Sequence, residues 1–203
     1  MALSKIQAES MNLADTFAFT GTVTGASTLV PISRSTSTST VTSIDFDNLS
    51  TDFDTFYVTY FLKPVTDGNG VKFRFLDSTG TAISSSNAYQ YYSDAEGVIG
   101  GNANGDTLLH IAGGVGNANY EGHSGYFYIQ NRNYVADSTN KRAASIMGGY
   151  THVNSSGNGN HGFHSGHLSP TGQQAIRGFS VFDSGGNGVG HHDAMLYGVR
   201  LPS

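Results

Sequence analysis

Hydrophobic residues recur at every second position in several short segments of this chain, and this spacing limits the fold more than any other feature. The clearest case is a run in which three apolar residues alternate with two basic ones: Val71, Lys72, Phe73, Arg74 and Phe75. Successive side chains of a β-strand point to opposite faces, so the pattern predicts a strand with one buried and one wet face. Residues 17–23 and 42–46 show the same alternation. We therefore expect a protein built from β-strands.

Further strand-like runs are separated by clusters of Gly, Asn and Ser. They lie at residues 56–62, 107–111, 125–131, 143–150, 175–182 and 193–199. Charged residues make up only 12% of the chain and Gly accounts for 27 of its 203 residues, a balance typical of strands joined by turns. Cysteine is absent, but a chain of this length can bury a core without disulfides. These features predict an all-β fold, an antiparallel β-sandwich of jelly-roll type.

The first residues differ from the rest of the chain. Residues 1–14 contain apolar side chains with neither a helical nor a strand period, and no glycine interrupts them. We interpret them as an N-terminal extended arm that either docks on a partner or frays, as many termini do. Residues 15–203 are predicted to form a single β-sandwich domain.

Turn-forming residues predict how the strands are connected. Residues 56–62 and 71–75 are expected to pair as a hairpin. The Ser/Thr-rich tract 33–40 is expected to be an edge strand or an ordered loop, because the hydrophobic pattern resumes directly after it. Three polar stretches are interpreted as connections: residues 82–104, which contact a partner or hide a short strand, the loop 154–160, and a hairpin turn at 185–190.

The polar arm leads into an aromatic strand-like segment, Phe17-Ala18-Phe19-Thr20-Gly21-Thr22-Val23. An arm followed by a Phe-x-Phe-x-Gly-x-Val segment resembles the opening of virion proteins from marine tailed bacteriophages, in which it leads into a β-rich, tail-fibre-like or structural domain. The resemblance is strongest over residues 4–30. It continues more weakly through residues 44–62 and in the ending Leu196-Tyr197-Gly198-Val199.

This resemblance implies a structural subunit of a tailed-phage particle, a tail-fibre or capsid-decorating protein, made in the host cytoplasm and located in the virion. It implies other virion subunits as partners and a homotrimer as the assembly. The arm would then tie one subunit to its neighbour through apolar residues: Ile6, Met11, Leu13, Phe17 and Phe19. Neither enzymatic activity nor a cofactor is expected from it.

The charge of the chain argues against two other kinds of partner. The formal net charge is −5 and the ten basic residues are scattered, whereas binding to nucleic acid depends on clustered Lys and Arg. No apolar stretch approaches the roughly 20 residues that a membrane-spanning helix needs. We therefore expect no nucleic-acid binding and no membrane insertion.

Histidines are the residues most suggestive of chemistry. They recur at every third position in one segment, His161, His164 and His167, and a second group contains His191, His192 and Asp193. Imidazoles bind transition metals, and a carboxylate can orient them. Residues three apart face opposite sides of a strand, however, and the two intervening glycines disfavour a helix. We interpret the first group as solvated or hydrogen-bonded loop histidines and metal binding as the less favoured alternative.

Tyrosines point to a second function, a glycan-binding adhesin at a receptor-binding fibre tip. Aromatic rings stack on sugars, and host surface glycans would be the partner. The candidate residues are Tyr89, Tyr91 and Tyr92 in the expected loop, together with Tyr120, Tyr126 and Tyr128.

A polysaccharide-degrading enzyme is a third hypothesis. The acidic pairs that it would use are Asp45 with Asp47 and Asp52 with Asp54, but no apolar setting marks either pair for a raised pKa. No Gly-x-Ser-x-Gly motif is present to indicate a serine hydrolase. We rank catalysis last and expect that this protein is not an enzyme.

Overall fold

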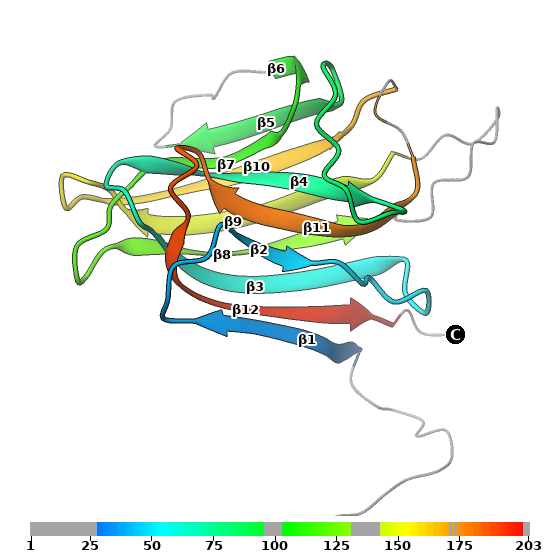
Figure 1. Ribbon diagram of the computed structural model, residues 1–203, viewed down its shortest axis with the longest axis horizontal. Coiled ribbons are helices and arrows are strands. Elements are labelled where there is room, and N and C mark those ends of the chain that lie inside the picture. Colours follow the sequence, from blue (N-terminus) through cyan, green and yellow to red (C-terminus); the bar gives the residue numbers. More distant parts are fainter. Residues whose placement is uncertain (1–27, 96–102, 131–142, 171, 173, 201–203) are drawn as a thin grey trace, which may run out of the picture.

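A computed structural model describes residues 28–95, 103–130, 143–170, 172 and 174–200. These residues form two antiparallel sheets that pack face to face around one hydrophobic core (Figure 1). The fold is an all-β sandwich, as the sequence predicts. Within the described residues, no helix has the length and apolar character needed to span a membrane.

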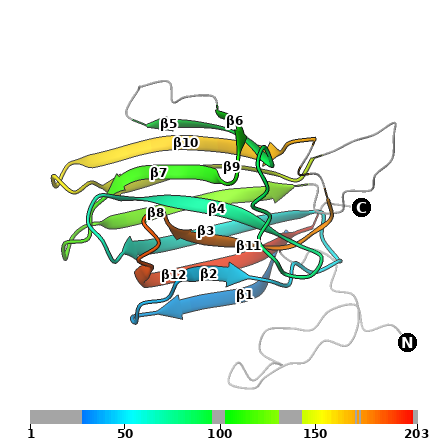
Figure 2. The ribbon, with the colours of Figure 1, turned by 45° about the horizontal axis from the view of Figure 1, so that its top comes forward.

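The large sheet has eight strands. In spatial order they are β1 (Leu29–Ser37), β12 (Val189–Val199), β3 (Thr55–Pro64), β8 (Gly122–Gln130), β9 (Ser145–Val153), β10 (Gly159–Leu168), β5 (Tyr89–Ala95) and β6 (Ala103–Asp106). The small sheet has four, in the order β2 (Ser43–Phe46), β11 (Ile176–Asp183), β4 (Asn69–Asp77) and β7 (Leu109–Val115). Figure 2 shows the large sheet running from β1 at one side to β5 and β6 at the other.

The strand order is that of a jelly roll. The chain alternates between the sheets from β1 to β4, returns to the small sheet at β7, and crosses again from β7 to β8 and from β11 to β12. Four strands of the large sheet, β1-β12-β3-β8, therefore face the four strands β2-β11-β4-β7, which is the eight-strand arrangement of this fold. The remaining strands, β9, β10, β5 and β6, widen the large sheet beyond the jelly roll.

The two expected hairpins are wrong. Strands β3 and β4 lie in different sheets, as do β11 and β12, so the turns between them carry the chain across the sandwich. The period of two identifies a strand and its buried face, but it does not say which sheet the strand joins. The Ser/Thr tract is better predicted, because it lies largely in β1 at the edge of the large sheet.

Residues 82–104, interpreted as a connection, hold β5, one of the two alternatives foreseen for them. The histidine segment 161–167, interpreted as a loop, lies in strand β10, which was not foreseen. The buried positions of β10 are Gly162, His164, Gly166 and Leu168, so small or polar residues occupy most of its inner face. This composition hides the alternation that marks the other strands.

Aromatic rings hold the two sheets together at the centre of the core. Phe127 of β8 meets Phe73 of β4 and Phe179 of β11 edge to face, each with ring centroids 5.5 Å apart. All three side chains are fully buried. Buried aromatic rings bring large apolar areas out of water, and edge-to-face pairs add about 1 kcal/mol each. This contact fixes the inner face of the large sheet and thereby determines which residues point outward.

Candidate functional site

The outer face of the large sheet carries a row of aromatic and apolar side chains. Tyr197, Tyr57, Tyr128 and Met147 lie directly opposite one another on the neighbouring strands β12, β3, β8 and β9. The same row continues on β10 and β5, where it ends at Tyr92. Paired residues of a sheet point to the same side. A second row, two residues along, contains Tyr126 and Phe163 on either side of Gly149.

We call this surface the aromatic face and define it by Tyr57, Tyr92, Tyr126, Tyr128, Met147, Phe163 and Tyr197. Five of its seven members are among the most exposed large apolar residues in the described chain, with Phe163 63% exposed and Met147 55% exposed, while Tyr57 and Tyr197 are half-buried. The outer face of an antiparallel sheet is ordinarily polar. From β12 to β5 the row crosses about 24 Å at the usual strand spacing of ~4.8 Å. An apolar patch of this width marks a binding surface.

Tyr57 lies at the centre of the tyrosine cluster. Its ring centroid is 4.9 Å from that of Tyr128 and 6.1 Å from those of Tyr126 and Tyr197. Partial burial, followed by the proximity of these three phenols, raises the pKa of Tyr57 above its ordinary value. This phenol therefore remains neutral at physiological pH, and a partner surface can cover it without displacing a charge.

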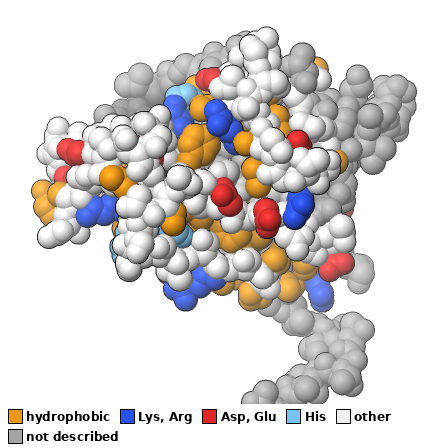
Figure 3. All heavy atoms as spheres, in the orientation of Figure 1, with side chains coloured by type: hydrophobic (Ala, Val, Ile, Leu, Met, Phe, Trp, Pro, Cys, Tyr) orange, Lys and Arg blue, Asp and Glu red, His pale blue; other side chains and the backbone are white. Residues whose placement is uncertain are grey.

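A charged pair borders this cluster on β1 and β12. The guanidinium of Arg34 donates two hydrogen bonds to Asp193, with N–O distances of 2.9 and 2.6 Å. The hydrogen bond from Arg34 holds the pKa of the Asp193 carboxyl below its ordinary value. A polar rim around an aromatic centre is the usual arrangement of a protein–protein interface. Figure 3, in the orientation of Figure 1, shows basic and acidic side chains scattered over the visible surface, with no continuous patch of one sign.

The three tyrosines predicted to bind glycans lie on strand β5 and not in a loop. Successive side chains of a strand point to opposite faces, so the three rings do not form one surface. Tyr89 is fully buried, donates its hydroxyl hydrogen to the carbonyl of Ile83 and accepts a hydrogen bond from the backbone of Phe75. Tyr91 stacks on His110 at 5.0 Å. Of the three, only Tyr92 is on the aromatic face. Tyr89 belongs to the core and cannot stack on a ligand.

The three histidines of residues 161–167 are on strand β10, and the loop interpretation is wrong. His161 is exposed on the outer face, and His167 contacts Gln90 at 2.9 Å. His164 points to the inner face and is 2% exposed. The expectation that residues three apart face opposite sides is therefore correct. Within the described residues, no group of three or more His, Cys, Asp or Glu side chains is placed to hold a metal ion.

His164 instead belongs to a layer of buried histidines and tyrosines on the inner face of the large sheet. The layer comprises Tyr60, His123, Tyr150, His152 and His164, and neighbouring rings stack with centroids 5.0 to 6.1 Å apart. In the described part of the chain, neither ring nitrogen of His123 or His164 has a hydrogen-bond partner. Burial lowers the pKa of His123 well below its ordinary value, and lowers that of His164 to about 4. These two imidazoles are neutral at pH 7.

The arm residues predicted to form an interface, Ile6, Met11, Leu13, Phe17 and Phe19, lie outside the described residues. The aromatic face is the surface that sequence reasoning found only in part. It identified Tyr92, Tyr126 and Tyr128, but attributed them to glycan stacking alone. Tyr57 and Tyr197 lie more than a hundred residues apart in the chain, and only the register of β3 and β12 brings them together.

A jelly roll is compatible with many functions, so the fold alone does not assign one. The aromatic face and the buried histidine layer are the two features that distinguish this sandwich from an ordinary one with a polar exterior and an apolar core. No protein-family model, curated protein sequence or solved structure matches this chain significantly.

Proposed function

We propose that this protein is a non-enzymatic structural subunit of a tailed-phage particle, in a tail fibre or as a capsid decoration. We propose further that it forms a homotrimer through the aromatic face. The observation that carries the proposal is this face, on which three tyrosines cluster around Tyr57 and the adjoining strands present Met147 and Phe163. Tyrosine and methionine are enriched at the centres of protein interfaces.

The composition of the aromatic face favours contact between unlike patches. Tyrosines dominate over β12, β3 and β8, whereas Met147 and Phe163 lie over β9 and β10. In a cyclic trimer, one patch of each copy meets a different patch of the next, and the ring closes after three copies. The resemblance of the N-terminal region to phage virion proteins supports the same stoichiometry. Stable interfaces of this kind bury on the order of 2,000 Å².

The arm is a separate part of the proposal. Removing residues 1–14 is expected to abolish incorporation into particles and to leave the sandwich folded, because the core of the described residues begins after this segment. Incorporation is measured by mass spectrometry of purified particles, and folding by circular dichroism. Undiminished incorporation of the truncated chain would remove the arm from the account.

The particle assignment is tested with gold-labelled antibody against this chain on intact particles of the source phage, viewed by electron microscopy. Label over the capsid would indicate a decoration protein, and label on the tail or its fibres would indicate a fibre protein. Particles without label would contradict the assignment to the virion.

Two carboxylates in the described residues illustrate why a glycosidase is not favoured. Hydrogen bonds, first from the Thr79 side chain, lower the pKa of Asp77, and Arg34 lowers that of Asp193. A general acid for glycoside cleavage needs the opposite shift. The glycan-binding alternative is better supported, because the outer face of the large sheet carries two adjoining hollows that are both lined by Ser124, Thr151 and His161.

A further inference from the structure

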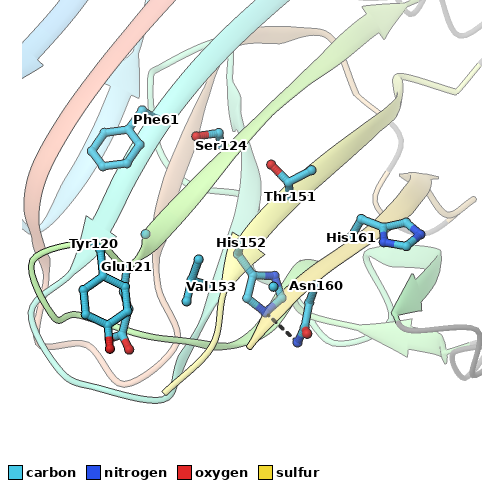
Figure 4. A pocket seen from close by; sticks show the side chains of 11 residues that line it. Phe61, Tyr120, Glu121, Ser124, Thr151, His152, Val153, Asn160 and His161 are labelled. Carbon is cyan, nitrogen blue, oxygen red and sulfur yellow. Dashed lines mark hydrogen bonds between the residues drawn. The ribbon is translucent and has the colours of Figure 1, made fainter. Parts of the chain in front are cut away.

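We propose that a groove across strands β8, β9 and β10 binds a neutral oligosaccharide. Its centre is a polar row formed by Ser124, Thr151 and His161, which lie directly opposite one another on the three strands. Phe61 of β3 continues the row at one end. Figure 4 shows these four side chains side by side across the sheet. The inference does not depend on the particle assignment. The groove shares Tyr126 and Phe163 with the aromatic face, so a bound sugar and a second copy of the chain compete for these two rings.

The groove consists of two hollows that share the polar row. One, of about 440 Å³, extends from the row toward Tyr120 and Asn160. The other, of about 600 Å³, extends toward Tyr126 and Phe163. Ser124, Thr151 and His161 line both. Each hollow has the volume of a small-ligand site, and together they suit an extended ligand better than a compact one.

The polar row offers groups that the protein itself does not use. Within the described residues, the hydroxyls of Ser124 and Thr151 make no hydrogen bond to another protein group, and both side chains are exposed. The row spans two strand spacings, about 10 Å, from Ser124 to His161. A hydroxyl both donates and accepts hydrogen bonds, and so does a neutral imidazole. Such groups match the hydroxyls along one edge of a sugar chain.

Aromatic rings lie on both sides of this polar row, along the direction of the strands. On one side Tyr120, on the turn before β8, is 74% exposed, and Phe61 lies beside Ser124 within the row. On the other side, two residues along β10 and β8, Phe163 is 63% exposed and Tyr126 is 39% exposed. Sugar rings have apolar C–H faces that pack on such side chains, while their hydroxyls need polar partners. The order aromatic, polar, aromatic along the groove therefore fits an oligosaccharide.

The charge of the lining indicates a neutral sugar. Neither hollow is lined by Lys or Arg, so the described residues provide no permanent cation for a carboxylate or sulfate group. The one acid, Glu121, is 7% exposed and accepts a hydrogen bond from the backbone N–H of Ala118 at 2.6 Å. It stabilises its own turn, and its negative charge disfavours an acidic sugar nearby.

The test uses the full chain and defined sugars. Cellotriose, maltotriose and chitotriose serve as neutral probes and 3′-sialyllactose as the anionic one, alongside an array of bacterial surface polysaccharides. Binding is measured by saturation-transfer NMR and by titration calorimetry. We expect at least one neutral glycan to bind and sialyllactose not to bind. Binding of anionic glycans only, or of no glycan, would overturn the proposal.

Thr151 provides a matched pair of variants for locating the site. Thr151→Val keeps the shape of the side chain and removes its hydroxyl, and it is expected to weaken binding about tenfold, the equivalent of one lost hydrogen bond. Thr151→Ser restores the hydroxyl and should bind within about threefold of the wild type. Equal binding by Thr151→Val and the wild type would show that the sugar binds elsewhere.

Sedimentation separates this result from a failure of the trimer. Thr151→Val adds no charge to the aromatic face and is expected to leave the oligomeric state unchanged. A chain that binds sugar as a monomer would contradict the trimer and leave this inference standing.

Discussion

Replacement of Tyr128 with aspartate is expected to convert the proposed trimer into monomers that remain folded. Tyr128 is 37% exposed on the aromatic face, and its ring packs on Tyr57 with centroids 4.9 Å apart. In the monomer the carboxylate stays in water, and the variant loses chiefly this ring contact, about 1 kcal/mol. In the trimer the same carboxylate is buried without a partner, which costs several kcal/mol in each of three interfaces.

The oligomeric state of this variant is measured by sedimentation velocity at micromolar concentration, and its folding by thermal unfolding followed with circular dichroism. Tyr128→Phe keeps the ring and is expected to remain trimeric. Tyr120→Asp places the same charge on an exposed turn outside the aromatic face and should also remain trimeric. The interface is wrongly placed if Tyr128→Asp stays trimeric, or if Tyr120→Asp dissociates to the same extent.

Acid is expected to destabilise the sandwich between about pH 6.5 and pH 4. Burial holds the pKa of His164 at about 4 in the folded protein, against an ordinary value of 6.5. The unfolded chain therefore binds a proton in this range that the folded chain does not bind, so stability is complete above pH 6.5 and falls as the pH is lowered. His164 alone accounts for a loss of about 3 kcal/mol. Burial also lowers the pKa of His123, which acts in the same direction.

The pH dependence is measured as the free energy of unfolding in urea at intervals between pH 7 and pH 4. His164→Leu removes one titrating group from the buried layer and is expected to reduce the slope by up to about 1.4 kcal/mol per pH unit. His161→Leu makes the same replacement on the exposed side of the same strand and is the matched control. Equal slopes in wild type and His164→Leu would show that this histidine is not held neutral by burial.

The sequence predicts the fold well where a strand has one apolar and one polar face. Val71, Phe73 and Phe75 identify the buried side of β4, and the Ser/Thr tract becomes the edge strand β1. The pairing of strands is a different matter. β3 pairs with β12, which is more than a hundred residues away, and not with its neighbour in sequence β4. Such pairing depends on contacts that no local pattern encodes.

The candidate site is less predictable than the fold, for the same reason. Tyr126 and Tyr128 alternate within one strand, so the sequence indicates that they share its outward face. The groove also needs Thr151 and His161. Only the register of β8, β9 and β10 aligns these two residues with Ser124. Tyr89 shows the converse error. Its tyrosine-rich surroundings suggest an exposed loop, whereas two buried hydrogen bonds hold its hydroxyl in the core.

The most direct test of the account is the mass of the purified full chain in solution, measured by sedimentation equilibrium across the micromolar range. The aromatic face predicts a single species of three copies, because burying its rings on another copy removes a large apolar surface from water. A chain that sediments as a monomer of 21.4 kDa throughout this range would contradict the proposal that the aromatic face joins copies of this protein.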